Sequence, residues 1–312
     1  MNINFIGNKN RFFALSISLI VLIIVATIIN GVKLDIQFQG GYIFTYSYEG
    51  DLDKDELEEE IEDTLNIPVG VQKTTDIGSG LNRIVVSFGA DKSLNNDEIQ
   101  AKLSNLMSNK FSNNNLKQIQ VNNVDPIVGK EFFLKCMIAV MFAAVIMIIY
   151  IAIRFKKIGG WSAGVMAVIA LIHDVILVYG TFIILKMPLN EHFIAGALMI
   201  LGYSLNDTIV IYDRIRENKK INGSKIPFPE LVNKSINQSL TRTINTTITT
   251  VMSIAVILIV AYLRGVNSII SFMLPLMVGM IAGTYSTIFI AGPLWVVWKE
   301  REKKERLQKI SD

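Results

Sequence analysis

Residues 193–212 have the sequence FIAGALMILGYSLNDTIVIY, in which Asp207 is the only charged side chain. A bilayer core of about 30 Å requires roughly 20 helical residues, because backbone groups inside it find no water and must pair within the segment. The stretch therefore predicts a transmembrane helix. A carboxylate within such a helix normally faces a partner or a water-filled path, since exposing it to lipid costs roughly 3 kcal/mol or more.

Five further segments have the same length and apolar character, so the chain is predicted to cross a membrane six times. These segments are residues 12–29, 136–153, 161–185, 246–263 and 271–297. The first follows two bases, Lys9 and Arg11, as a secretory signal peptide does. It is long for a signal peptide and no small-residue cleavage site follows, so an uncleaved anchor is expected.

The composition divides the chain into two unlike parts. Of its 312 residues, 51% are apolar and 18% charged, and the mean hydropathy of +0.43 argues against a soluble globular protein. Residues 30–135 hold 17 acidic and 10 basic side chains, whereas the remaining 206 residues hold 10 acidic and 20 basic ones. The net charge of +3 thus averages an acidic, water-soluble insert and a basic membrane body, and indicates no nucleic-acid partner.

The bases in the short connections predict the orientation, because lysine and arginine are retained on the cytoplasmic side. The two termini and the connections after the second and fourth spans hold 18 bases, and the other two short connections hold only Lys186 and Arg264. Both termini are therefore expected in the cytoplasm and residues 30–135 outside. Residues 213–245 are expected to form a cytoplasmic loop with an amphipathic helix, and residues 298–312 a basic tail at the lipid surface.

Within the external insert, the hydrophobic period alternates between that of strands and that of helices. Strands are predicted at 36–48, 69–75, 83–88 and 116–124, and helices at 53–65 and 94–107, the second with Asn95 or Asn96 near its cap. The order β-α-β-β-α-β is that of the ferredoxin-like fold. The sequence therefore predicts a polytopic α-helical membrane protein with one external ferredoxin-like α+β domain.

The insert shows no catalytic pattern, because it lacks a nucleophile–base set, a phosphate-binding loop and metal-ligand spacing. The ferredoxin-like fold has many functions, so the fold alone identifies none. We expect a binding or lever domain and no enzymatic activity.

Metal-binding and redox residues are scarce throughout the chain. Cys136 is the only cysteine and lies in an apolar run, so neither an intrachain disulfide nor a cysteine-based zinc site can form. His173 and His192 are the only histidines. No metal or other cofactor is expected.

Three ionisable groups inside a span, or at its mouth, are candidates for function. Asp174, beside His173, lies near the middle of the third span, Asp207 lies in the inner half of the fourth, and Arg242 lies at the cytoplasmic mouth of the fifth. His173 and Asp174 either extend a proton relay or form a structural pair.

Small and polar residues align with these groups at helical spacing. On the fourth span, Asp207 shares a face with Ser204, Tyr203 and Gly196, and Asn206 is a neighbouring polar residue. The fifth span is expected to face it with Arg242, Thr246, Thr249 and Ser253, with Asn245 and Thr250 at the edges. Hydroxyl-lined helices around a carboxylate are what a proton path requires, although the serines and threonines taken singly are better explained as helix-packing contacts.

For Asp207 and Arg242 together, proton coupling is the stronger interpretation. A nearby guanidinium favours the ionised carboxylate and desolvation favours the protonated one, so small helix movements would move the proton. Carrying one charge through 100 mV releases roughly 2.3 kcal/mol.

In the last span, Gly279 and Gly283 form a GxxxG pair that is expected to be a packing face.

Residues 202–218, GYSLNDTIVIYDRIREN, closely resemble the signature of the SecF family, the protein-export membrane subunits of the bacterial Sec machinery within the RND superfamily. Three more segments match, namely LIHDV at 171–175, QSLTRT at 238–243 and PIVGKEF at 126–132. The segment DIQFQGG at 35–41 resembles the family's G-I-D-F-x-G-G. It departs at Asp35, where the family has Gly, and at Gln37, where it has Asp; Asp125 likewise replaces a Gly before Pro126.

The resemblance covers nearly the whole chain and implies a six-span half of an RND-type bundle. It matches Asp207 and Arg242 to an intramembrane Asp and Arg that are essential for proton coupling in the family, with Asp174, His173, Ser204 and Asn206 as weaker candidates here. Residues at structural positions of the family motifs are Gly40, Gly41, Pro126, Gly129, Gly202, Asp213 and Arg214.

The same resemblance implies a function. A member of this family pairs with the homologous SecD in the bacterial cytoplasmic membrane, associates with the SecY/SecE/SecG channel and often with YajC, and uses the proton-motive force to help exported polypeptides across. The external domain would engage or brace the emerging polypeptide.

Other membrane functions fit the sequence less well. One half of a proton-coupled RND-type small-molecule exporter would use the same coupling chemistry, but complete exporters usually carry two six-span halves. An intramembrane aspartyl protease needs Tyr-Asp and Gly-x-Gly-Asp motifs, whereas Asp174 follows His and Asp207 follows Asn. A dyad of Ser204 and His173 lacks the Gly-x-Ser-Gly setting of rhomboid-type proteases.

Overall fold

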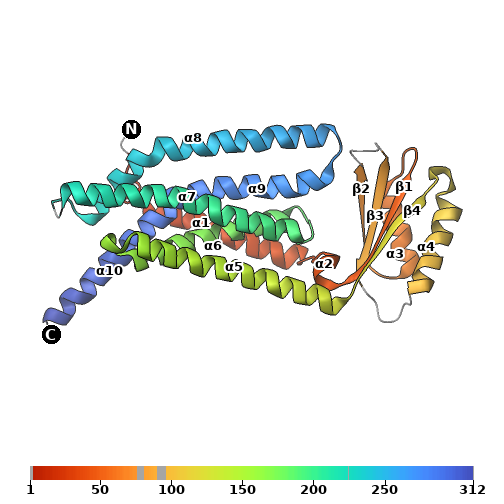
Figure 1. Cartoon of the computed structure of the whole chain (residues 1–312), viewed down its shortest axis with the longest axis horizontal. Coiled ribbons are helices and arrows are strands. Elements are labelled where there is room, and N and C mark those ends of the chain that lie inside the picture. Colours follow the sequence, from red (N-terminus) through yellow and green to blue (C-terminus); the bar gives the residue numbers. More distant parts are fainter. Residues whose placement is uncertain (1–2, 76–80, 90–95, 224, 312) are drawn as a thin grey trace.

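Long helices form the membrane body, and a small α/β domain lies at one end of the bundle (Figure 1). The computed structural model describes residues 3–75, 81–89, 96–223 and 225–311. Within these residues, 6 helical segments are long and apolar enough to cross a membrane, as predicted. They are α1 (Lys9–Asn30), α5 (Pro126–Arg154), α6 (Gly160–Ile184), α7 (Glu191–Asn222), α8 (Phe228–Leu263), and a last segment that combines α9 (Asn267–Ser286) and α10 (Gly292–Ser311).

A short π-helix, η3 (Thr287–Ala291), joins α9 to α10 within the last segment. Its wider turn shifts the hydrogen-bonding register of the helix by one residue, and such turns occur frequently at functional sites. The π-helix packs against α6 and α7 at mid-bundle, so it lies beside the buried polar residues described below.

The helices differ in how much of their surface the chain itself covers. Helices α6, α7 and α9 pack against one another at the centre, whereas α1 and α5 have mostly uncovered surfaces. The uncovered surfaces carry large apolar side chains such as Ile28, Met141 and Ile153. This distribution is typical of a membrane protein, in which lipid covers the outer surface.

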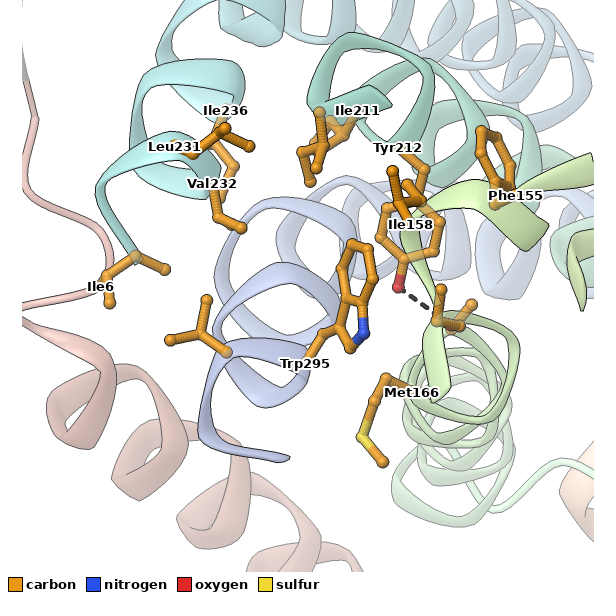
Figure 2. Packing of buried hydrophobic residues seen from close by; sticks show 14 of the residues in the cluster. Ile6, Phe155, Ile158, Met166, Ile211, Tyr212, Leu231, Val232, Ile236 and Trp295 are labelled. Carbon is orange, nitrogen blue, oxygen red and sulfur yellow. Dashed lines mark hydrogen bonds between the residues drawn. The ribbon is translucent and has the colours of Figure 1, made fainter. Parts of the chain in front are cut away.

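One end of the bundle has a dense apolar core (Figure 2). Trp295 is fully buried there, with its ring 5.1 Å from that of Tyr212 and 5.0 Å from that of Phe228. The Tyr212 hydroxyl donates to the Ala163 carbonyl of α6 at 3.1 Å, which satisfies the polar end of this buried ring. This core fixes α10 against α6, α7 and α8.

The connection between the fourth and fifth spans differs from the predicted loop with its own amphipathic helix. Helix α7 continues to Asn222 and α8 begins at Phe228, so the two spans extend past the apolar region and pair with each other. The Asn218 side-chain amide donates to the Ser235 hydroxyl at 2.9 Å and to the side-chain oxygen Oε1 of Gln238 at 2.7 Å. The amphipathic surface of this region thus belongs to two span extensions, because these amide contacts favour continued helix over a loop.

The external domain has the predicted ferredoxin-like topology. Strands β1 (Gly41–Tyr48), β2 (Val69–Thr75), β3 (Asn82–Gly89) and β4 (Lys117–Val124) form an antiparallel sheet in the order β2-β3-β1-β4. Helices α3 (Lys54–Leu65) and α4 (Asn96–Lys110), followed by the short η1 (Ser112–Asn114), cover the face turned away from the bundle (Figure 1). Asn96 is the first residue of α4, and Asn95 lies outside the described residues.

Alternating side chains from the sheet and one face of each helix build the core of this domain. Phe44, Ile84, Leu57, Ile61 and Leu103 are fully buried. The Asp53 side chain caps α3 by accepting from the Asp55 amide at 2.9 Å, and the acidic residues of the helix remain on its solvent face. A surface of this composition suits contact with other molecules in water.

The first predicted strand is shorter than expected. Residues 36–39 form a single helical turn, α2 (Ile36–Gln39), and the strand begins at Gly41. Asp35 accepts from the Gln37 amide at 3.0 Å and so caps the turn, and Gly40 ends it with φ of 82°. The alternation of apolar and polar residues in this segment suits a strand equally well, and the capping Asp favours the helical turn.

The base of the external domain packs closely on the start of α5. A Cβ atom on Gly40 would lie 2.3 Å from the Pro126 Cα, and one on Gly129 would lie 3.0 Å from the Gly40 amide nitrogen. Gly41, with φ of 149°, leaves similarly little room beside the Phe88 carbonyl. The two segments singled out at 35–41 and 126–132 therefore form one junction between the domain and the membrane body.

Replacing Gly40 by Ala is expected to lower the free energy of unfolding by about 2–5 kcal/mol, because the added methyl clashes with backbone and the positive φ is unfavourable for alanine. Thermal unfolding of the purified chain and protease cleavage at the junction measure the effect. Gly89→Ala is the control, since a Cβ there meets no atom within 4 Å. Equal stability of the two variants would contradict the packing described.

Candidate functional site

Asp207 is buried inside the membrane body without a hydrogen-bond partner for one oxygen. Only 3% of its surface is exposed, and its Oδ2 atom finds no donor among the described residues. The positive charge of Arg242 on the neighbouring helix α8 acts on this carboxylate, yet within the described chain no carboxylate lies within 4 Å of the guanidinium. A buried carboxylate with a free oxygen and a nearby, exposed cation is free to exchange a proton or to take a further partner.

Asp174 lies at the centre of a second, well-satisfied polar cluster. Its side chain is fully buried on α6, and its Oδ2 accepts from the hydroxyls of Ser204 and Ser286, each at 2.7 Å. Its Oδ1 lies 3.2 Å from the His173 Nδ1. The carboxylate thereby joins α6, α7 and the end of α9.

His173 itself is only partly satisfied. Its Nε2 is buried and has no hydrogen-bond partner among the residues that the structure describes. Its ring lies 6.1 Å from that of Tyr285, whose hydroxyl donates to the Phe12 carbonyl of α1 at 2.8 Å. The structure therefore gives His173 and Asp174 a packing role, and the free Nε2 leaves a role in proton transfer open to test.

Hydroxyl groups continue the polar cluster along the helices. Thr208 and Thr287 have their hydroxyls 3.0 Å apart, and Thr287 also donates to the Ser204 carbonyl at 3.3 Å. On the other side of α9, the Thr284 and Thr247 hydroxyls lie 2.5 Å apart. Hydroxyls thus link α7, α8 and the last span on both sides of the glycine face.

The glycines of the last span provide close helix contacts, as predicted. A Cβ on Gly283 would lie 2.9 Å from the Ser204 Cβ, and one on Gly279 would lie 2.6 Å from a methyl of Val178. Small residues at these positions let the last span approach α6 and α7. This approach is what brings Ser286 within reach of Asp174.

The polar stripe predicted on the fifth span faces outward. Arg242, Asn245, Thr249 and Ser253 are exposed, and the hydroxyls of the stripe bond back to carbonyls of their own helix. The hydroxyls that α8 turns inward are instead those of Thr243 and Thr247. The prediction that this stripe packs directly on the α7 stripe is therefore wrong for the single chain.

On α7, the predicted candidates divide between inside and outside. Ser204 and Gly196 are buried, whereas Asn206 and Gly202 are exposed. Beyond the apolar region, Asp213 pairs with Arg216 at 2.6 Å and with Arg154 of α5 at 3.6 Å, and Arg214 bonds Gln238 of α8. The motif residues 213 and 214 therefore tie α7 to its two neighbours.

Sequence reasoning missed several members of the site. Ser286, Thr287 and Thr284 come from the last span, and Thr243 and Thr247 from the fifth. The signal for the first group was their position directly after Gly283, where a small residue permits close approach of a hydroxyl. The π-helix that orients Thr287 has no sequence signal comparable to a proline or a cap.

Two departures from the family pattern act as helix caps here. Asp125 accepts from the Ile127 amide at 2.8 Å at the start of α5, and Asp35 caps α2. Burial, the largest influence, raises the pKa of the Asp35 carboxyl above its usual value, and the negative charge of Glu191 raises it further. The hydrogen bond from the Gln37 amide and the charge of His192 lower this pKa and offset only part of the rise. Asp35 therefore sits at the junction as a partly desolvated acid.

Asp35→Asn is expected to stabilise the junction slightly at neutral pH, because asparagine caps equally well and has no charge to desolvate. A raised folded-state pKa means that the folded protein binds the proton more tightly, so its stability falls as the pH rises through that pKa. The advantage of the variant should accordingly shrink on acidification. Melting temperatures from pH 3 to pH 8 measure it, because the titration begins near the ordinary carboxyl pKa of 3.8, with the exposed cap variant Asp53→Asn as control. A gain that grows at low pH would contradict the assignment.

The fold and the site together define a class of protein: a multi-pass membrane protein in which six helices enclose polar clusters and carry one external ferredoxin-like domain. The match to a family is equally direct. Residues 104–301 fit the family model described as "Protein export membrane protein SecD/SecF, C-terminal". The chain belongs to the SecD/SecF family.

Individual relatives agree over almost the full length. The chain is 34% identical to the protein translocase subunit SecF of Petrotoga mobilis, over 97% of this chain and 98% of the relative. It is 30% identical to SecDF of Bacillus subtilis, of which it spans 39%. The solved structure of SecDF from Thermus thermophilus, titled a translocon-associated membrane protein, superposes with a TM-score of 0.78 at 29% identity, over 96% of this chain and 39% of that one. These relatives support a subunit of the Sec translocation apparatus.

Proposed function

We propose that this chain uses the proton-motive force to assist polypeptide export across the bacterial cytoplasmic membrane. The observation that supports this most is Asp207, a buried carboxylate with one unpartnered oxygen on a central helix, next to the exposed cation Arg242. A carboxylate in this setting gains or loses its proton as the surrounding helices move. Each proton passing through 100 mV supplies roughly 2.3 kcal/mol for such movements.

We propose SecD as the partner. The SecDF relatives are single chains of which this chain spans about 40%, so the remaining part is available as a second subunit. The exposed polar stripe of α8 supports a further helical bundle on this side, because Arg242, Thr249 and Ser253 would otherwise face lipid. The SecY/SecE/SecG channel and YajC are proposed as wider partners from the family resemblance.

The external domain would act on the exported polypeptide by contact. Its α3 presents an acidic solvent face, and its glycine-packed junction with α5 links it rigidly to the membrane body. A rigid link is what transmits helix movement to a lever. No chemical step is assigned to the domain, and we propose that the chain is not an enzyme.

We propose that His173 and Asp174 form a second polar cluster with a structural role, beside the coupling pair Asp207 and Arg242. Asp174 holds three helices through two serine hydroxyls, and the free Nε2 of His173 offers a proton acceptor within the same cluster. Export measured with and without a proton gradient tests the whole proposal, and Asp207→Asn isolates the carboxylate.

The proposed orientation predicts which cysteines react from outside. In a Cys136→Ala background, a membrane-impermeant maleimide should label Lys102→Cys on α4 in intact spheroplasts and Lys220→Cys at the end of α7 only in inverted vesicles, since both positions are exposed. The physical reason is the retention of 18 bases on one side. The reverse labelling pattern would refute the orientation.

A further inference from the structure

A pocket of about 800 Å³ lies outside the coupling site. Its lining residues belong to the end of the bundle where α10 projects away from the other helices, and Figure 1 shows the course of this helix. Its walls come from the end of α5, the short η2 (Lys156–Ile158), the start of α6 and the middle turns of α10. Ala152 and Met166 form an apolar floor and are buried. The volume matches that of sites for small organic molecules.

Two exposed tryptophans mark this pocket as a membrane-interface feature. Trp161 is 68% exposed and Trp298 is 50% exposed, and both line the pocket. Tryptophan concentrates at the headgroup level of bilayers, where its ring is apolar and its N–H is solvated. The remaining tryptophan, Trp295, is fully buried behind the wall, where its Nε1 donates to the Ser162 hydroxyl at 3.0 Å.

The rim of the pocket is basic and incompletely neutralised. Lys156, Lys299 and Arg301 line it together with two glutamates. Lys299 pairs with Glu302 at 2.8 Å and Arg301 with Glu305 at 3.1 Å, whereas Lys156 has no carboxylate within 4 Å in the described part of the chain. Lys156 is therefore the exposed base of this rim that, within the described residues, remains open to an anionic partner.

The position of Lys299 adds to this charge. A Cβ on Gly159 would lie 3.1 Å from the Lys299 Nζ, so the ammonium sits over the start of α6. Glu302, whose carboxylate lies 2.8 Å from the Lys299 Nζ, offsets this charge beside the positive end of the helix.

We propose that this pocket binds the phosphate headgroup of an anionic phospholipid, with the upper part of its acyl chains on the apolar floor. Basic pockets between transmembrane helices bind anionic lipid headgroups in this way. The mixture of exposed tryptophans, apolar floor and basic rim suits an amphiphile better than a free soluble anion. Under the orientation proposed above, the lipid belongs to the cytoplasmic leaflet, and its role is to hold α10 against α5 and α6.

Tryptophan quenching tests the proposal, because two of the three tryptophans line the pocket. The full-length chain is reconstituted in phosphatidylcholine containing small fractions of either brominated phosphatidylglycerol or brominated phosphatidylcholine. Brominated phosphatidylglycerol should quench at several-fold lower mole fraction. A Trp161→Phe/Trp298→Phe variant, which leaves only buried Trp295, should lose this preference.

Charge variants identify the rim as the cause. Lys156→Gln/Lys299→Gln should weaken the phosphatidylglycerol preference at least tenfold, since each base near a membrane surface contributes roughly fivefold in affinity for anionic lipid. Lys219→Gln/Lys220→Gln removes the same charge from exposed positions at the same end of the bundle and should keep the preference. Val165→Phe, which fills the pocket without changing charge, should reduce it as well.

Each of the following results would overturn the proposal. The first is equal quenching by the two brominated lipids, or equal behaviour of the pocket and control lysine variants. The second is that 10 mM inorganic phosphate abolishes the quenching by brominated phosphatidylglycerol while the chain shows no preference between the two lipids. This result would assign the pocket to a soluble anion. A folded but insensitive Val165→Phe variant would place the lipid elsewhere on the surface.

Discussion

Asp207→Asn is expected to abolish the part of polypeptide export that depends on the proton gradient, reducing it at least tenfold to the gradient-free rate. Asparagine has nearly the same shape, so the packing of α7 should survive, but it cannot take up and release a proton. The carboxylate Oδ2 has no hydrogen-bond partner in the described chain, so little bonding is lost with it. Export into inverted vesicles, with the gradient present and then collapsed, measures the effect.

Controls separate coupling from folding in this experiment. Glu217→Gln makes the same chemical change on the same helix, at an exposed residue paired with Arg214, and should leave export unchanged. Arg242→Ala should match the loss seen with Asp207→Asn, and Arg242→Lys should be partly active because lysine keeps the charge but lacks the planar fork. Normal gradient-dependent export by the Asp207→Asn protein would remove Asp207 from the mechanism. Loss of the folded chain would instead show that its role is structural.

The membrane architecture could be predicted from the sequence because a bilayer imposes one simple requirement. Every spanning backbone group must be paired, so a run such as residues 193–212 has few alternatives to a helix. The topology of the external domain was equally predictable, since helix and strand periods alternate clearly there. The extension of α7 to Asn222 was missed because polar residues past the apolar region carry no such constraint.

Which side of α8 faces the bundle could not be predicted, because hydroxyl side chains lie on several sides of this helix. Thr243 and Thr247 lie on the buried side, and Thr246, Thr249 and Thr250 on other sides, so helical spacing defines more than one polar stripe. Contact with the last span, where the Thr247 hydroxyl lies 2.5 Å from that of Thr284, selects the buried pair. The turn at Ile36–Gln39 was missed for a different reason, since four alternating residues fit a strand as well as a helix.

The outward polar stripe leads to the second large expected effect, which concerns a partner chain. Arg242, Thr249 and Ser253 are exposed on α8, and Asn206 is exposed on the adjacent α7. A groove of about 340 Å³ lies on this surface, and Thr249 and Ser253 line it together with mostly apolar side chains such as Met199. Lipid would leave the charge of Arg242 and the exposed polar side chains of the stripe without polar partners, so a second helical bundle is expected to cover them.

Single cysteines at Asn206 or Thr249, in a Cys136→Ala background, should therefore form crosslinks to a partner chain in native membranes, with most of the chain trapped. Ser204 and Gly196 are unsuitable for this test, because both are buried within the chain itself. Met141→Cys, on an exposed apolar surface of α5, is the control and should stay uncrosslinked. If Asn206→Cys and Thr249→Cys instead react with lipid-soluble maleimides as fast as the control and trap no partner, the stripe faces lipid. Proton coupling would then have to operate within a single six-helix body, with Asp207 and Arg242 as the coupling pair.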